Sequence, residues 1–127
     1  MIVRSLEDLQ TMGRHVDRPG AFESSRYLLR EDGVGFAMTQ VTLAAGTELE
    51  LEYKNHIEAN LVIAGEGAVL DVAAGTEHPL SPGVMYTLDA HDRHRLRTTT
   101  DMTVVSIFSP AIVGTEVHDA DGSYPLL

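Results

Sequence analysis

Hydrophobic and polar residues alternate with a period of two through most of this chain. The alternation is clearest from Phe36 to Leu43, where Phe36, Met38, Gln40 and Thr42 interleave with Ala37, Thr39, Val41 and Leu43. Successive strand residues point to opposite faces of a sheet, so this pattern predicts a β-strand. Further strands are predicted at 25–30, 47–53, 59–64, 68–72, 84–88, around Leu96 and at 102–108, with a short one that ends near Leu80. The run 102–108 is the most apolar and is expected to be a central strand that Pro110 ends.

Turn residues punctuate these segments about every eight to twelve residues, which is typical of an all-β sandwich or barrel. The N-terminal part differs, because Ser5 precedes Asp8 by three residues in a capping pattern that predicts one short helix at about 6–12. Residues 15–20 are predicted to form a loop, with Pro19-Gly20 as its turn and Asp32-Gly33 as a later hairpin reversal. We therefore expect an all-β double-sheet jelly roll or small β-barrel of about nine or ten strands, with one short N-terminal helix.

The amino-acid composition limits which kinds of protein and which kinds of functional site are possible. The chain has 127 residues, of which 43% are hydrophobic, and this predicts one folded domain over 1–127. The absence of cysteine excludes disulfides, thiolate metal sites and a cysteine nucleophile. A net charge of −10 argues against nucleic acid and anionic membranes as partners. No apolar run has the length of a membrane span or a secretory leader, so a cytoplasmic location is expected.

The first candidate functional residues lie in the segment His56-Ile57-Glu58. Its histidine and glutamate are two residues apart and share one face of an extended backbone. Downstream, the turn Pro82-Gly83 leads to Tyr86 and then to a polar corner that holds His91 and His94. Taken alone, Tyr86 reads as a core aromatic, and the pattern leaves the role of His94 open.

Two motifs in this arrangement resemble those of the cupins. Six residues separate Glu58 from Gly65, and Pro82-Gly83 leads toward the histidines, as in the two cupin motifs. Cupins usually carry two further histidines six and four residues before that glutamate, where this chain has Glu52 and Lys54. A site of three histidines and one glutamate is therefore absent.

The ectoine synthases are a cupin branch without that histidine pair, and the chain resembles them over nearly its whole length. The matching blocks are residues 1–4, 33–36, 53–59, 65–67, 88–97 and 114–126. By this resemblance Glu58, Tyr86 and His94 are the metal ligands. Such a set suits Fe(II), with Zn(II) or Mn(II) as competitors, and a nearby cation helps the tyrosine bind as phenolate.

The resemblance also implies the reaction, which closes N-γ-acetyl-2,4-diaminobutyrate into the compatible solute ectoine with loss of water. A metal would polarise the acetamide carbonyl, and a neutral imidazole or carboxylate would move protons. The positions implied to be catalytic are Tyr53, His56, Glu116 and His118, and those implied to bind substrate are Phe22, Arg26, Thr39, Val41 and Phe108. Residues 110–127 are expected to form a tail across the barrel mouth, which without the resemblance would be interpreted as a frayed terminus.

Plain structural roles compete with several of these assignments. His56 either orients the site or binds substrate, or it is a surface residue at a hairpin end. Arg26 could instead be a solvated strand residue, and Tyr53 and Phe108 could instead be ordinary core residues. Several pocket positions also depart from the family, with Phe22, Thr39 and Val41 in place of Trp, Asn and Thr, and Asn60-Leu61 in place of Val-Tyr.

These departures keep other functions open. One is a relative that acts on a different amino-acid derivative, and another is a cupin that binds a small molecule or metal without turnover. Because cupins often associate through edge or exchanged strands, a homodimer is expected.

Overall fold

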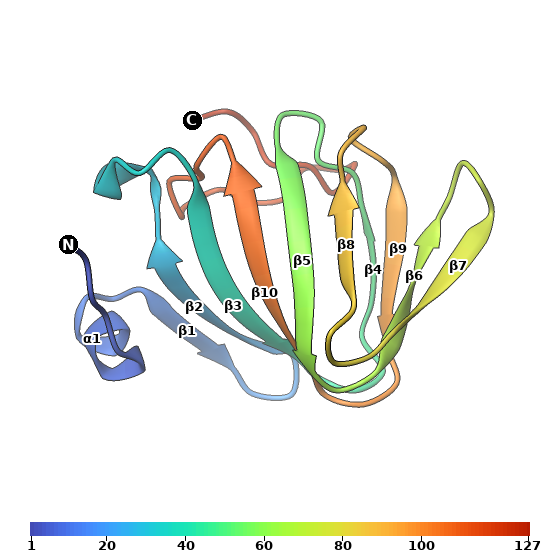
Figure 1. Cartoon of the computed structure of the whole chain (residues 1–127), viewed down its shortest axis with the longest axis horizontal. Coiled ribbons are helices and arrows are strands. Elements are labelled where there is room, and N and C mark those ends of the chain that lie inside the picture. Colours follow the sequence, from blue (N-terminus) through green and yellow to red (C-terminus); the bar gives the residue numbers. More distant parts are fainter.

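Two antiparallel β-sheets that face each other make up the computed structural model, which describes residues 1–127 (Figure 1). The larger sheet has six strands in the order β1-β2-β3-β10-β5-β8, and the smaller has four in the order β4-β9-β6-β7. The elements are α1 (Leu6–Thr11), β1 (His15–Arg18), β2 (Phe22–Leu28), η1 (Arg30–Asp32), β3 (Ala37–Leu43), β4 (Glu48–Leu51), β5 (Ile57–Ala64), β6 (Gly67–Asp71), β7 (Thr76–Leu80), β8 (Met85–Leu88), β9 (His94–Thr98) and β10 (Met102–Ser109). The predicted all-β fold with one short N-terminal helix is confirmed.

The N-terminal segment holds one correction. Residues 15–18 form the edge strand β1, which pairs with β2 in the register His15↔Ser25, where a loop was predicted. Its side chains are polar or only half-buried, so the segment carries no hydrophobic alternation that would reveal a strand. The reversal at Asp32-Gly33 is a 3₁₀ turn, η1, rather than a tight hairpin, and Gly33 closes it at φ 72°.

The helix and η1 are tied to the sheet through one buried carboxylate. Arg4 and Arg14 both donate hydrogen bonds to Asp32, at 2.8 Å in each pair. Ser5 caps α1 in the predicted capping box with Asp8. No helix of the chain has the length and apolar character needed to cross a membrane.

Cross-strand register arranges the inner face of the larger sheet in rows. Since β10 lies between β3 and β5, as the prediction of a central strand required, each inward residue of β10 has a neighbour on both sides. The first row is Val41–Val104–Val62, the second is Thr39–Ser106–Asn60, and the third is Ala37–Phe108–Glu58. The interior therefore changes from apolar to polar toward one end of the barrel.

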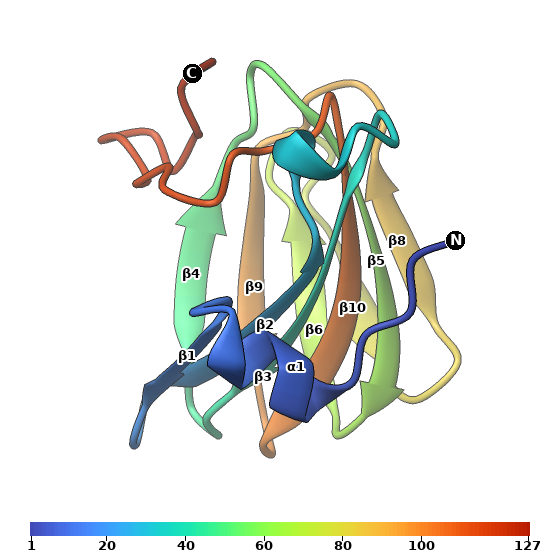
Figure 2. The same ribbon diagram turned by 90° about the vertical axis from the view of Figure 1, so that its left-hand side faces the viewer.

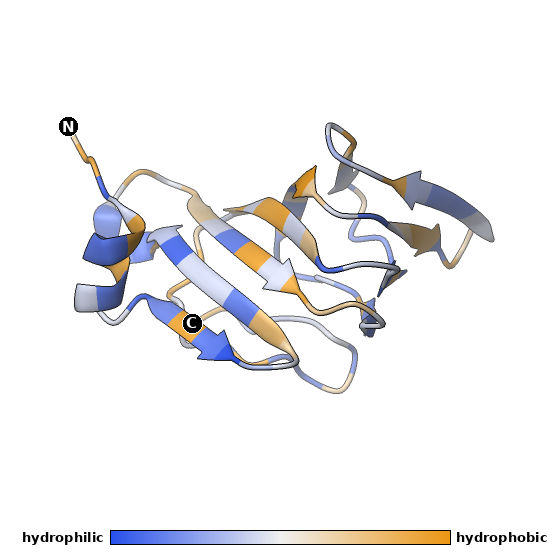
Figure 3. Ribbon diagram, turned by 90° about the horizontal axis from the view of Figure 1, so that it is seen from below, coloured by the Kyte–Doolittle hydropathy of each residue, from blue (hydrophilic) through white to orange (hydrophobic).

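The apolar end is filled by a cluster that both sheets share. Its buried members are Leu43, Val62, Val69, Leu80, Leu96, Met102 and Val104. Figure 3 shows the alternation of hydrophobic and hydrophilic residues along the strands that makes this one-sided burial possible.

At the opposite end, the start of β5 and the ends of β8 and β10 lie beside the C-terminal segment, which is red in Figure 1. Residues 110–127 contain no strand and run across this end, as Figure 2 shows from the side. Glycine makes the crossing possible, because a Cβ at Gly122 would lie 2.6 Å from the Glu50 carbonyl oxygen. The tail is thus held against the end of β4.

Candidate active site

A cavity of about 560 Å³ opens between the two sheets under the C-terminal tail. Its walls include most of the residues that the sequence singled out: Phe22, Arg26, Thr39, Val41, Tyr53, Glu58, Tyr86, Phe108, Glu116 and His118. The remaining two, His56 and His94, do not line it but are buried beside it, with 2% and 1% of their surface exposed. One end of the barrel thus gathers segments from residue 22 to residue 118.

His94 has a buried ring nitrogen that no hydrogen bond uses. It is the first residue of β9, and its Nδ1 lies 2.9 Å from the carbonyl oxygen of Asp92. A carbonyl only accepts hydrogen bonds, so Nδ1 carries the proton and Nε2 holds a lone pair. Burial lowers the pKa of His94, which keeps the ring neutral. Nε2 is buried without a hydrogen-bond partner, as is expected of a nitrogen placed to bind a metal.

Glu58 is a buried carboxyl group with no cation beside it. Burial raises its pKa to about 7, although Asn60 Nδ2 donates to Oε1 at 2.8 Å. Tyr86 lies on the neighbouring strand, where burial and then the charge of Glu58 raise the pKa of its phenol. Its ring centroid is 6.3 Å from that of His94. A divalent cation among the three would compensate the buried negative charge.

This donor set fits a metal only if tyrosine takes part. No group of three His, Cys, Asp or Glu side chains in the chain is arranged to hold an ion. The lone pair of His94, the buried carboxyl of Glu58 and the phenol of Tyr86 would supply one nitrogen and two oxygens, which suits a first-row divalent metal.

Tyr53 and His118 are hydrogen-bonded to each other in the cavity wall, with 2.9 Å between the hydroxyl oxygen and Nε2. Tyr53 follows β4 and is 3% exposed, and burial raises its pKa well above the usual value. His118 lies in the tail, and burial lowers its pKa. A neutral phenol thus meets a neutral imidazole, a pair through which a proton can pass.

His56 is an interior residue, so its interpretation as a surface residue at a hairpin end is wrong. Its ring packs edge-on against Phe108 and Tyr124, burial lowers its pKa, and Nδ1 has no hydrogen-bond partner. The backbone of this loop is held by His91, whose Nδ1 donates to the carbonyl oxygens of Tyr53 and His56 at 2.7 and 3.1 Å. His91 therefore shapes the corner.

Glu116 is occupied by its own segment. Its two carboxylate oxygens accept hydrogen bonds from the backbone N–H groups of Val113 and Gly114, each at 2.7 Å. Burial opposes ionisation, but these donors lower the pKa of Glu116 below its usual value. The charged carboxylate therefore orders the tail turn that leads to His118.

The predicted substrate positions follow the row pattern of the larger sheet. Arg26 pairs in register with Thr39, and Val41 lies one inward position further along β3. Phe108 belongs to a buried cluster with Tyr53 and packs edge-to-face on it, with centroids 5.3 Å apart. It is at once a core residue and part of the cavity wall.

Sequence reasoning missed several residues that complete the site. Ser106 is a polar residue on the buried face of β10, the most apolar strand. A polar residue at such a position could have pointed to the site from the sequence alone. Tyr124 lies in a block quoted for the family resemblance but was given no role, and its ring stacks on His118. Ser123 accepts a hydrogen bond from the backbone N–H of Lys54 at 3.0 Å and so fixes the tail to the loop after β4.

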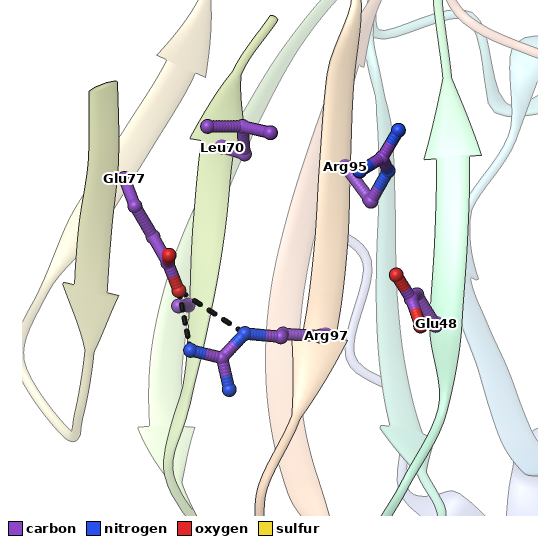
Figure 4. A pocket seen from close by; sticks show the side chains of 6 residues that line it. Glu48, Leu70, Glu77, Arg95 and Arg97 are labelled. Carbon is purple, nitrogen blue, oxygen red and sulfur yellow. Dashed lines mark hydrogen bonds and ion pairs between the residues drawn. The ribbon is translucent and has the colours of Figure 1, made fainter. Parts of the chain in front are cut away.

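A second hollow, of about 140 Å³, lies on the outer face of the smaller sheet (Figure 4). Both of its arginines have carboxylate partners, since Arg97 donates to Glu77 and Arg95 donates to Glu50, which lies outside the hollow. The hollow holds none of the residues assigned to the site above.

Comparisons with known proteins show the family to which the chain belongs. The sequence pattern of the family described as ectoine synthase matches residues 1–127. An L-ectoine synthase from Sphingopyxis alaskensis is 49% identical over 125 residues, covering 98% of this chain and 90% of the relative. One from Oceanobacillus iheyensis is 49% identical over 127 residues, covering 100% of this chain and 98% of the relative.

Comparison with solved structures gives the same family. The crystal structure of ectoine synthase from P. lautus has a TM-score of 0.85 and 43% identity, and the match covers 100% of this chain and 91% of that one. A RmlC-like cupin from Shewanella frigidimarina has a TM-score of 0.64 at 20% identity, over 76% of this chain and 83% of that one, which shows a shared fold alone. The cavity beneath the tail and the full-length match lead to one conclusion: this chain belongs to the ectoine synthase family of cupin lyases.

Proposed function

We propose that the chain closes N-γ-acetyl-2,4-diaminobutyrate into ectoine, with loss of water, in the cavity beneath the tail. The buried, partnerless Nε2 of His94 carries the proposal, because the ring of His94 lies near that of Tyr86, and Tyr86 lines the cavity together with the buried carboxyl of Glu58. Fe(II) is the proposed ion, with Zn(II) or Mn(II) as competitors. When bound, it would act as a Lewis acid toward the acetamide carbonyl.

Binding of the substrate carboxylate is assigned to Arg26. Arg26 lines the cavity, and a guanidinium can bind a carboxylate through two parallel hydrogen bonds. Phe22, Thr39, Val41 and Phe108 are proposed to shape the rest of the cavity, with Thr39 opposite Arg26 in the sheet register. The substrate is thereby anchored by its charged end.

Proton transfer is assigned to the residues under the tail. Ring closure forms a carbon–nitrogen bond, and the carbonyl oxygen leaves as water with two protons that come from the attacking amine. His118 is neutral and bonded to Tyr53, so this pair can accept a proton and return it to the departing oxygen. His56 lies behind them against Phe108 and is proposed to orient this wall, while Glu116 holds the tail in place.

Closure by the tail serves the same chemistry. The backbone N–H of Lys54 donates to Ser123, and the side chain of Asn55 donates to the carbonyl oxygen of Tyr124, so the tail is held over part of the cavity mouth and reduces its contact with bulk water. A dehydration gains from this exclusion because the product amidine is then shielded from hydrolysis.

The test uses protein purified under anaerobic conditions, loaded with Fe(II) and incubated with N-γ-acetyl-2,4-diaminobutyrate. A product lighter by one water, observed by mass spectrometry and lost in Glu58→Gln and His94→Ala, is the expected outcome. Metal binding and a substrate-induced thermal shift without product would favour a different amino-acid derivative. Failure of the wild-type chain to take up any divalent ion would overturn the proposed metal centre.

We further propose that the chain works as a homodimer in the cytoplasm. The larger sheet leaves β1 and β8 as free edges, and Leu61 and Met85, which are paired in register next to the β8 edge, are 42% and 58% exposed. An unpaired edge with exposed apolar side chains is stabilised when a second copy covers it. Sedimentation at micromolar concentration should give twice the monomer mass, and a monomer would refute the proposal.

A further inference from the structure

A chain of hydrogen bonds ends on the carboxyl group of Glu58. Ser106 Oγ donates to Asn60 Oδ1 at 2.7 Å, and Asn60 Nδ2 donates to Glu58 Oε1 at 2.8 Å. The three residues are 6%, 3% and 6% exposed, so water does not compete for these bonds. Buried bonds to a carboxylate are among the stronger ones in proteins.

The sheet register explains why these residues meet. Asn60 lies on β5 between Ser106 on β10 and Tyr86 on β8, and it is directly opposite both. Glu58 is two residues earlier on β5, so its side chain leaves the same face of the sheet. Asn60 is therefore next to two of the three proposed metal ligands.

The Glu58 carboxylate determines which way the Asn60 amide points. It accepts from the NH₂ group, and a reversed amide would place an oxygen against it. The Ser106 hydroxyl can donate or accept, and it donates to the amide oxygen that this orientation turns toward it. Ser106 therefore holds the amide in the orientation that Glu58 selects.

We propose that Asn60 is a positioning residue that holds the Glu58 carboxylate in the orientation needed to bind the metal, and that Ser106 supports the Asn60 amide in this role. The inference rests on the metal centre proposed above. A hydrogen bond on Oε1 removes one degree of rotational freedom from the ligand, and loss of such support typically weakens metal affinity by about 10- to 100-fold.

This chain combines Asn60 with a serine directly across on β10, so donor and support occur together. The alternative is that the pair only satisfies polar groups in the core, which would affect folding but not metal affinity.

The test compares metal affinity with stability in a double variant, Asn60→Val with Ser106→Ala. Removing both polar partners together leaves neither an amide nor a hydroxyl group unpaired, so the only bond lost by a remaining group is the one that Glu58 accepts from Asn60. Metal-free proteins are titrated with Co(II) in competition with a chelator, and the visible spectrum of the bound ion is recorded. We expect the double variant and Asn60→Val to bind Co(II) at least tenfold more weakly and with an altered spectrum.

Two single variants sharpen the comparison. Ser106→Ala keeps the bond from Asn60 to Glu58, so it should lose only a few-fold in affinity. Thr39→Val changes the other polar side chain of the same row, on the far side of Ser106 from Asn60, and should bind Co(II) as the wild type does. Thermal unfolding of each metal-free protein checks that a change in affinity is not a loss of fold.

The outcomes separate this inference from the function on which it rests. Wild-type affinity and spectrum in the double variant would overturn the positioning role and leave the metal centre intact. A wild-type protein that binds no Co(II), Fe(II), Zn(II) or Mn(II) would overturn both.

Discussion

The imidazole of His118 lies parallel to the ring of Tyr124, with the two centroids 4.3 Å apart and the planes inclined by 4°. Tyr124 also packs on Tyr53, the hydrogen-bond partner of His118, with centroids 5.2 Å apart. The end of the tail thereby fixes the ring that the proposed proton transfer uses. Residues that belong to separate parts of the chain form one aromatic unit at the cavity mouth.

Replacing Tyr124 with alanine removes the surface on which His118 rests. An aromatic pair contributes about 0.5–1.5 kcal/mol beyond buried area, so kcat/KM for ring closure should fall by about 2- to 10-fold. Tyr124→Phe keeps the stack and serves as the control. Equal losses in both variants would show that the hydroxyl group, not the stack, matters.

The tail is closed by a loop around Asp119. Its Oδ1 accepts hydrogen bonds from the backbone N–H groups of Asp121 and Ser123, at 2.9 and 3.0 Å. Asp119→Ala should speed amide hydrogen exchange throughout residues 113–127 while exchange in β10 stays slow. Asp119→Asn keeps the accepting oxygen and should retain most of the protection. Uniform exchange in all three proteins would contradict an anchoring role.

Asp32 predicts a dependence of stability on pH. Hydrogen bonds from Arg4 and then Arg14 hold the pKa of this carboxyl well below its usual value. A depressed folded-state pKa contributes stability above the unfolded value of about 3.9, and this contribution is lost as pH falls through the folded value. Asp32→Asn should therefore unfold more easily at pH 7, on the order of 3 kcal/mol. The difference from wild type should shrink steadily below about pH 4 in chemical denaturation.

Gly65, the glycine of the first cupin motif, has no room for a side chain, so its replacement should lower stability. Its φ is +83°, and a Cβ there would lie 2.0 Å from the carbonyl oxygen of Asp101 and 2.7 Å from Met102 Cα. Gly75 has a similar φ of +69° with nothing within 4 Å, so it is a matched control. Gly65→Ala should be less stable than Gly75→Ala by about 1–3 kcal/mol, the usual range for overpacking. Equal melting temperatures would contradict this.

Much of the fold was predictable because its physical cause is local. Alternation located β3 and β10, and the capping pair of Ser5 and Asp8 located α1. The strand β1 escaped prediction because an edge strand needs only backbone pairing and shows no apolar face. The residues at the site were named from a family resemblance. How close they lie to one another depends on the pairing of strands that are distant in the sequence, as with Asn60 on β5 opposite Tyr86 on β8.

What the sequence did not reveal were individual side-chain contacts, whether between near neighbours in the chain or between distant residues. Nothing in the pattern around Glu116 indicates that its carboxylate binds the backbone of residues 113 and 114. Likewise, the bond from Ser106 to Asn60 joins residues 46 positions apart. Such pairs depend on how strands align, and a one-residue slip would turn every inward side chain outward.

The valine row and the cluster below it seal one end of the barrel. If ring closure takes place above this plug, the departing water and the cyclic product have only the tail side through which to leave. The turnover rate would then depend on how often the tail segment 113–124 moves away from the cavity mouth. Opening of this segment would limit the rate as much as the chemical step does.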